Sequence, residues 1–149
     1  MPGKKRLLFA SSRACQGCLS CVVACAQRNE GMSAPSKARI QVNLDPFGGN
    51  NHLRYCMQCK SAPCAEACPV DAIFLVSKGG YWAVDYDLCI GCKQCISACP
   101  LGVMFYDPID DKVIKCETCQ GDPICAQVCP TEALIWGDPA ERRNYRRGG

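Results

Sequence analysis

Apolar residues occur in short runs separated by polar turn residues, and two pairs of these runs predict β-hairpins. Residues 70–76 (VDAIFLV) and 81–87 (YWAVDYD) flank the turn SKGG. Residues 102–107 (GVMFYD) and 112–115 (KVIK) flank PIDD in the same way. Short β-rich runs on either side of a break of this kind are typical of hairpins. No run is long enough to predict a large hydrocarbon core.

Three short segments, CAEAC, CISAC and CAQVC, favour single helical turns because Ala, Glu and Gln suit a helix. Each is followed by a proline, at Pro69, Pro100 and Pro130. Proline fixes φ and disfavours the α region for the residue before it. We therefore expect each last cysteine to be extended and to point away from its own group.

Two other segments lack such patterns. Residues 26–52 contain no cysteine and several glycines and prolines, which predicts a loop-rich connector. The tail, GDPAERRNYRRGG, is polar and basic. Its four arginines are expected either to remain in solvent or to dock an acidic partner or another copy of the chain.

Cysteine makes up 16 of the 149 residues, which is unusually high. The length suits one domain or two very small ones. A chain with a small apolar core needs disulfides or bound metal to supply stability. The net charge of +3 counts thiols as neutral, so the basic residues are expected to balance bound thiolates.

The cysteines form four groups, and this internal repeat is the dominant signal in the sequence. Each group reads as C-x2-C, a variable gap, then C-x3-C. The groups are Cys15, Cys18, Cys21 and Cys25; Cys56, Cys59, Cys64 and Cys68; Cys89, Cys92, Cys95 and Cys99; and Cys116, Cys119, Cys125 and Cys129.

This spacing is typical of [4Fe–4S] chemistry. A cubane cluster needs four thiolates, and cysteines at i, i+3 and i+6 on a curled loop reach three corners of one cube. Glycines such as Gly17 and Gly91 let the backbone approach the sulfurs closely. In the C-x2-C-x2-C-x3-C-P run the last cysteine ligates the other cluster of a pair. Two clusters held side by side therefore explain the crowding.

Two alternatives fit less well. Disulfides need an oxidising compartment, whereas the start MPGKKRLLFASSRAC lacks the apolar length of a secretory signal. No stretch approaches a membrane span, so we expect a cytoplasmic protein with reduced thiols and no direct membrane span. A structural zinc module would use two C-x2-C pairs per ion, and the evenly spaced triplets do not follow that plan.

Other activities lack their residues. No phosphate loop or dinucleotide fingerprint is present. His52 is the only histidine, which leaves no catalytic triad. Aromatic residues do not alternate with basic ones as single-strand binders require, so nucleic acid is not an expected partner. Four cysteines per cluster would leave no open iron, so the chain is not expected to be an enzyme alone.

The motifs resemble known electron-transfer proteins. Residues 53–107, above all VDYDLCIGCKQCISACPLGVMFYD, are similar to bacterial two-cluster ferredoxins. From about Lys4 to Trp136 the chain resembles the four-cluster subunits of molybdenum and tungsten oxidoreductases, and CMQCKSAPCAEACP is typical of their second group. That family includes subunits of dimethyl-sulfoxide reductase, formate dehydrogenase, nickel carbon-monoxide dehydrogenase and tungsten aldehyde oxidoreductase.

The resemblance implies an α+β fold of two ferredoxin-like units, one inserted in the other. The inner unit would be residues 53–107, and the outer unit residues 1–52 and 108–149. The implied ligand sets are Cys56, Cys59, Cys64 with Cys99; Cys89, Cys92, Cys95 with Cys68; Cys15, Cys18, Cys21 with Cys129; and Cys116, Cys119, Cys125 with Cys25.

The expected function is electron transfer through four [4Fe–4S] clusters to or from a catalytic subunit that carries a tungsten or molybdenum pterin. An aldehyde oxidoreductase is the first choice, because the chain is short and shows no anchor. A carbon-monoxide dehydrogenase, a hydrogenase or a formate dehydrogenase is the alternative partner, and a free ferredoxin-like carrier is the alternative function. Further copies of the chain or a flavin subunit could complete the complex.

Overall fold

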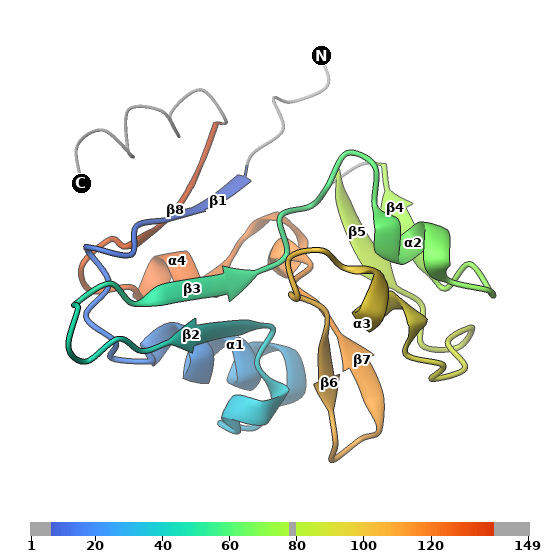
Figure 1. Cartoon of the computed structure of the whole chain (residues 1–149), viewed down its shortest axis with the longest axis horizontal. Coiled ribbons are helices and arrows are strands. Elements are labelled where there is room, and N and C mark those ends of the chain that lie inside the picture. The colour runs from blue at the N-terminus through green and yellow to red at the C-terminus, as the bar shows by residue number, and fades with distance from the viewer. Residues whose placement is uncertain (1–6, 78–79, 139–149) are drawn as a thin grey trace.

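A computed structural model describes residues 7–77 and 80–138. The basic arginines of the tail lie outside these residues. Figure 1 shows two groups of elements side by side, which we call the terminal lobe and the central lobe. The terminal lobe holds β1 (Leu7–Ala10), α1 (Ser20–Glu30), the 3₁₀ turn Pro35–Lys37, β2 (Ile40–Asn43), β3 (His52–Tyr55), α4 (Ile124–Val128) and β8 (Leu134–Gly137). The central lobe holds α2 (Pro63–Ala67), β4 (Ile73–Val76), β5 (Tyr81–Val84), α3 (Gln94–Ala98), β6 (Phe105–Asp107) and β7 (Lys112–Ile114), and a 3₁₀ turn, Thr118–Gly121, leads back to α4.

All the strands pair as two-stranded antiparallel sheets in the described residues. The expected hairpins are confirmed as β4–β5, with Ile73 opposite Val84, and β6–β7, with Phe105 opposite Ile114. The pairing of β1 with β8 joins segments from the two ends of the chain. This pairing brings the first and fourth cysteine groups into the same lobe.

The predicted extended backbone at the Cys-Pro steps is confirmed. The residues directly after helices α2, α3 and α4 are Cys68, Cys99 and Cys129, whose ψ angles of 116°, 113° and 113° are extended. In the first group Ala26 stands where the others have proline. Helix α1 therefore continues past Cys25 to Glu30 and stops at Gly31, whose φ of 69° is a left-handed cap that glycine adopts readily.

The prediction that residues 26–52 form only a loop-rich connector is wrong. This segment contains the last turns of α1 and the strand β2, which pairs with β3. Ile40 and Leu53 are buried beneath this sheet. Tyr55 on β3 is buried and donates its hydroxyl to the Leu8 carbonyl at 3.0 Å. The strands are too short to give a clear alternation, so burial against α1 decides their conformation.

Each lobe has its own apolar core. The terminal core comprises Leu8, Cys21, Val22, Cys25, Ala26, Ala38, Ile40, Leu53, Tyr55, Cys125 and Leu134. The central core comprises Ala62, Cys64, Ile73, Val84, Cys95, Met104 and Val113. Leu53 and Tyr55, assigned above to the inner unit, thus pack in the terminal core. Val113, assigned to the outer unit, packs in the central core.

Ion pairs hold residues of the terminal lobe to the β6–β7 hairpin and the segment after it. Lys37 Nζ lies 2.9 Å from Asp107 and 2.6 Å from Asp110. Glu30 pairs with Lys112 at 3.0 Å. Both Lys37 and Asp107 are buried, so each charge depends on its partner. These contacts fix the position of one lobe against the other.

Candidate iron–sulfur cluster sites

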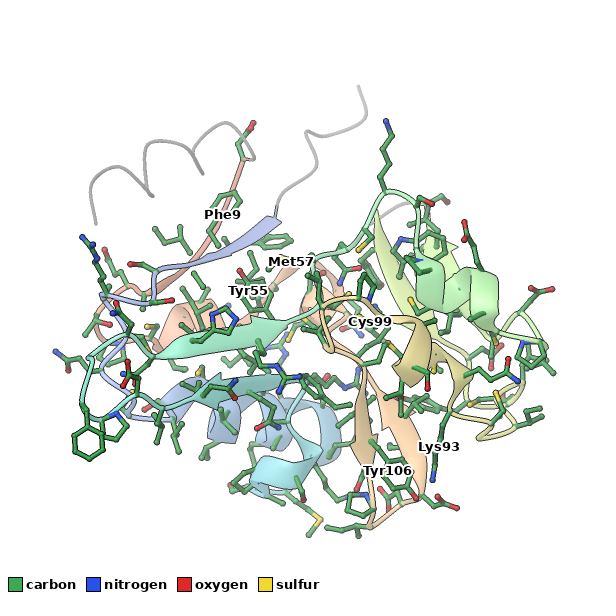
Figure 2. All side chains as sticks on the ribbon, in the orientation of Figure 1. Phe9, Tyr55, Met57, Lys93, Cys99 and Tyr106 are labelled. Carbon is green, nitrogen blue, oxygen red and sulfur yellow. The ribbon has the colours of Figure 1, made fainter. Side chains whose placement is uncertain are left out.

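The first cavity of the central lobe is lined by cysteines from two groups. Cys56, Cys59 and Cys64 come from the second group, and Cys99 comes from the third. Figure 2 shows Cys99 near Met57, which also lines this cavity. The extended backbone after α3 places Cys99 here rather than with its own group. Ala62, Val103 and Met104 complete an apolar wall, and Lys115 supplies a charge.

A second cavity repeats this arrangement with the roles exchanged. Its cysteines are Cys89, Cys92 and Cys95 of the third group and Cys68 of the second. Helices α2 and α3 pack against each other and carry the exchanged cysteines at their ends. Lys93 lines the same cavity, and its Nζ lies 4.0 Å from the centre of the Tyr106 ring (Figure 2). This contact holds the loop before α3 against β6.

In the terminal lobe, α1 packs against α4 and brings the first and fourth groups together. Burial raises the pKa of the Cys125 thiol far above its usual range, and the neighbouring thiols of Cys116 and Cys25 add to the shift. Burial likewise raises the pKa of Cys21 to about 11, with a smaller contribution from Cys129. The Cys25 thiol is thus an electrostatic neighbour of the fourth group, and the Cys129 thiol is a neighbour of Cys21 in the first group.

The same electrostatic neighbours give the order of the four sets. Cys125 of the fourth group is close to Cys21 of the first. Burial raises the pKa of Cys116 to about 12, and the neighbouring thiol of Cys56, in the second group, adds to the rise. Burial raises the pKa of Cys95, in the third group, to about 11, and the neighbouring thiol of Cys64, in the second group, adds to the rise. These electrostatic neighbours indicate the order first, fourth, second and third for the four groups.

The two sets at the ends of this row each include a solvent-exposed cysteine. These are Cys18 in the first group and Cys92 in the third, and the structure classes no other cysteine as exposed. Ile90, two residues before Cys92, exposes 65% of its surface. The cysteines of the two middle sets are buried or half-buried. Electrons from outside the molecule would therefore reach the end sets most directly.

Backbone N–H groups point at several thiols. Arg39 N donates to Cys25 Sγ at 3.2 Å, and Ala72 N donates to Cys68 Sγ at 3.2 Å. Gln58 N and Thr118 N donate to Cys56 and Cys116 at 3.4 Å. Burial raises the pKa of Cys68, but N–H donors from Val70, Ala72 and Ile73 outweigh it and lower the pKa. Such donors stabilise a thiolate and the negative cluster bound to it.

The arrangement fits a cluster better than a single ion. No three His, Cys, Asp or Glu side chains within residues 7–77 and 80–138 converge closely enough to hold one metal ion. Eight thiols of the second and third groups line the walls of two cavities, as the corners of a cubane require. A structural zinc site would draw four ligands around a single point.

Two buried polar residues beside the cysteine sets were missed from the sequence. Lys115 is completely buried, and Gln58 is 4% exposed. Gln58 lies within the second C-x2-C, and Lys115 directly precedes Cys116, so proximity to the cysteines was the available signal. Neither residue type predicts burial, because Lys and Gln are mostly exposed in proteins.

Comparison with known families agrees with this geometry. Residues 51–139, more than half of the chain, match the family described as "4Fe-4S dicluster domain". The chain belongs to this family. A similar protein, a polysulfide reductase subunit of Wolinella succinogenes, is 35% identical over 156 residues, which cover 95% of this chain and 80% of that protein.

Two further matches extend this result. The thiosulfate reductase electron transfer subunit PhsB of Salmonella typhi is 31% identical, over 88% of this chain and 74% of that subunit. One chain of the active site complex BamBC of benzoyl coenzyme A reductase, solved with benzoyl-CoA, superposes on this chain with a TM-score of 0.54. The two chains are 19% identical, and the match covers 96% of this chain and 87% of the other, which shows a common fold.

These matches identify an iron–sulfur electron-transfer subunit rather than a catalytic subunit. Its cofactors are [4Fe–4S] clusters. The sixteen cysteines of the chain equal in number the ligands that four such clusters need. The fold is a small mixture of helices and strands with a ferredoxin domain. None of the described helices is long and apolar enough to cross a membrane.

Proposed function

We propose that the chain holds its four clusters in one row and relays single electrons between a redox partner and a catalytic oxidoreductase subunit. One observation carries this proposal. Each cavity of the central lobe is lined by three cysteines of one group and the last cysteine of the other. This exchange is what places two clusters side by side. The clusters, when bound, supply the one-electron chemistry.

The protein's own residues hold and tune those clusters. The proposed ligand sets are Cys15, Cys18, Cys21 with Cys129; Cys116, Cys119, Cys125 with Cys25; Cys56, Cys59, Cys64 with Cys99; and Cys89, Cys92, Cys95 with Cys68. An apolar wall excludes water from the set that contains Cys56 and Cys99, and N–H donors favour the thiolates. The duplicated, inserted architecture is part of the proposal, with the two lobes as its units.

An electron count tests the relay. We expect the anaerobically purified chain to take up four electrons when it is titrated with a strong reductant, one for each cluster. A capacity of two electrons in a protein with its full iron content would contradict the four-cluster relay. Replacing Cys99 with serine provides a second test, because it should alter the resonance spectrum of the cluster bound by Cys56, Cys59 and Cys64 and leave the one bound by Cys89 intact.

The catalytic partner is proposed to carry a tungsten or molybdenum pterin, and a cytoplasmic aldehyde oxidoreductase remains the first choice. That choice rests on the resemblance stated above and on thiols that stay reduced in the cytosol. A reductase of sulfur compounds is the second candidate, because the two relatives above are named for polysulfide and thiosulfate reductases. A free carrier that shuttles between enzymes is the remaining alternative.

Purification from the native cell extract separates these candidates. A stable large partner that contains tungsten or molybdenum would support the subunit role, and its activity on an aldehyde, polysulfide or thiosulfate would name the class. A pterin-free partner would remove the pterin from the proposal. A chain that purifies alone with all its iron would favour the free carrier.

A further inference from the structure

Lys115 is a buried cation without a carboxylate partner in the described part of the chain. Its side chain is fully buried. Its ammonium donates to the Trp82 carbonyl and, at 3.0 Å, to the Cys116 carbonyl. No ion pair of the described residues includes Lys115, whereas buried Lys37 pairs with Asp107 and buried Arg39 lies 3.5 Å from Glu117. The charge of Lys115 therefore requires another source of negative charge.

That negative charge is available at the junction of the two middle cysteine sets. Lys115 lines the cavity of Cys56, Cys59, Cys64 and Cys99. It directly precedes Cys116, the first cysteine of the adjacent set. Its charge lowers the pKa of Cys64 and of Cys116, although burial is the larger effect and raises both. The ammonium thus lies beside cysteines of both sets.

Gln58 supports this arrangement because its side chain bonds to the backbone of the same two residues that the ammonium contacts. Its Nε2 donates to the Cys116 carbonyl at 2.7 Å, and its Oε1 accepts from the Trp82 N–H at 2.8 Å. Lys115 donates to the carbonyls of these same two residues. The four side-chain contacts join the second-group loop, β5 and the fourth group. The charge is therefore held between the two sets rather than left to move.

We propose that Lys115 is a fixed positive charge that raises the reduction potentials of the two middle clusters. This inference rests on the proposed four-cluster relay. Each added electron makes a cluster more negative, and a cation in a low-dielectric interior favours that state. A charge shared by neighbouring clusters also weakens the repulsion between them when both are reduced. Lys115 is a positioning residue in this sense, because it acts on the clusters through space.

Redox titration of the holoprotein, followed by electron paramagnetic resonance, tests the proposal. Lys115→Met removes the charge, Lys115→Gln keeps a donor without the charge, and Lys115→Arg keeps the charge. Lys60→Met is the matched control, because Lys60 is exposed beside Cys59 and its charge is screened by water. Iron and sulfide are measured for every variant, and the number of reducible clusters is counted separately.

We expect the ratio of reduced to oxidised cluster at a fixed potential to fall about tenfold for two of the four couples in Lys115→Met and Lys115→Gln. For a one-electron couple this corresponds to about 59 mV. Lys115→Arg and Lys60→Met should both keep the wild-type ratio of reduced to oxidised cluster. Unchanged reduction potentials in a Lys115→Gln variant with its full iron and sulfide content would overturn the proposal. Loss of iron from both neutral variants would also overturn it, because that result would assign Lys115 a structural role. A wild-type chain with fewer than four couples would instead refute the relay itself.

Discussion

Replacing Gln58 with methionine is expected to destabilise the junction between the lobes. Gln58 is buried and bridges the Cys116 carbonyl and the Trp82 N–H. Methionine has a similar volume, so the change removes hydrogen bonds without opening a large cavity. It leaves the Trp82 N–H without the amide oxygen that accepts from it. The Cys116 carbonyl keeps its contact with Lys115.

The size of the effect follows from these contacts. A buried donor left unsatisfied costs about 1–3 kcal/mol, and the loss of one further hydrogen bond costs about 1 kcal/mol. The expected decrease in the free energy of unfolding is therefore about 2–4 kcal/mol. In a chain of this length, 1 kcal/mol shifts the midpoint by about 2–4 °C, so Tm should fall by roughly 4–16 °C.

Loss of the visible absorbance of the clusters during an anaerobic temperature ramp measures this effect. All variants are compared at one scan rate, because unfolding with cluster loss is irreversible. Gln120→Met is the matched control: Gln120 has a φ of 55°, close to the 52° of Gln58, but its side chain is exposed. Equal midpoints for the two variants would refute the bridging role of Gln58.

Three further predictions concern the cysteine sets. Cys25→Ser should perturb the cluster bound by Cys116, Cys119 and Cys125, and a resonance change confined to the Cys15 cluster would show that the outer pairing is wrong. Ala26→Pro should break α1, destabilise the helix by about 3 kcal/mol or more and lower the iron content of the protein. Ala26→Gly is the control and should destabilise the helix by only about 1 kcal/mol. Equal iron content in the two variants would contradict the role of the uninterrupted helix. In the metal-free chain, Ser20 hydrogen bonds lower the pKa of Cys18, and burial raises the pKa of Cys21 to about 11. Because iodoacetamide reacts with the thiolate, it should label Cys18 at lower pH, whereas labelling of Cys21 should keep rising towards pH 11. Mass spectrometry measures the labelling of each cysteine, and identical pH profiles for the two would argue against the burial of Cys21. Because the raised pKa favours the neutral thiol in the folded chain, that contribution to stability is present below pH 9 and is lost as the pH rises through about 11.

Features that depend on neighbouring residues were predictable from the sequence. The β4–β5 and β6–β7 hairpins follow from short β-rich runs around a turn. The extended backbone at Cys68, Cys99 and Cys129 follows from the proline after each. The pattern of the cysteines themselves was sufficient to predict [4Fe–4S] chemistry.

Features that depend on distant contacts were not predictable. Strand β2 was missed because its conformation is decided by packing of Ile40 in the terminal core and by pairing with β3. The pairing of β1 with β8 joins segments more than 100 residues apart, and neither strand is longer than four residues. Burial of Lys115 also escaped prediction, because only the assembled junction places it beside two cysteine sets.

The central claim is a row of four clusters on one chain, and native mass spectrometry of the anaerobically purified protein tests it most directly. The claim predicts a mass increase of sixteen iron and sixteen sulfide per chain, four of each for every cubane. With a catalytic partner, the same measurement should show a complex whose small subunit carries this full load. A chain that carries zinc, only half of this iron, or no metal would contradict the account.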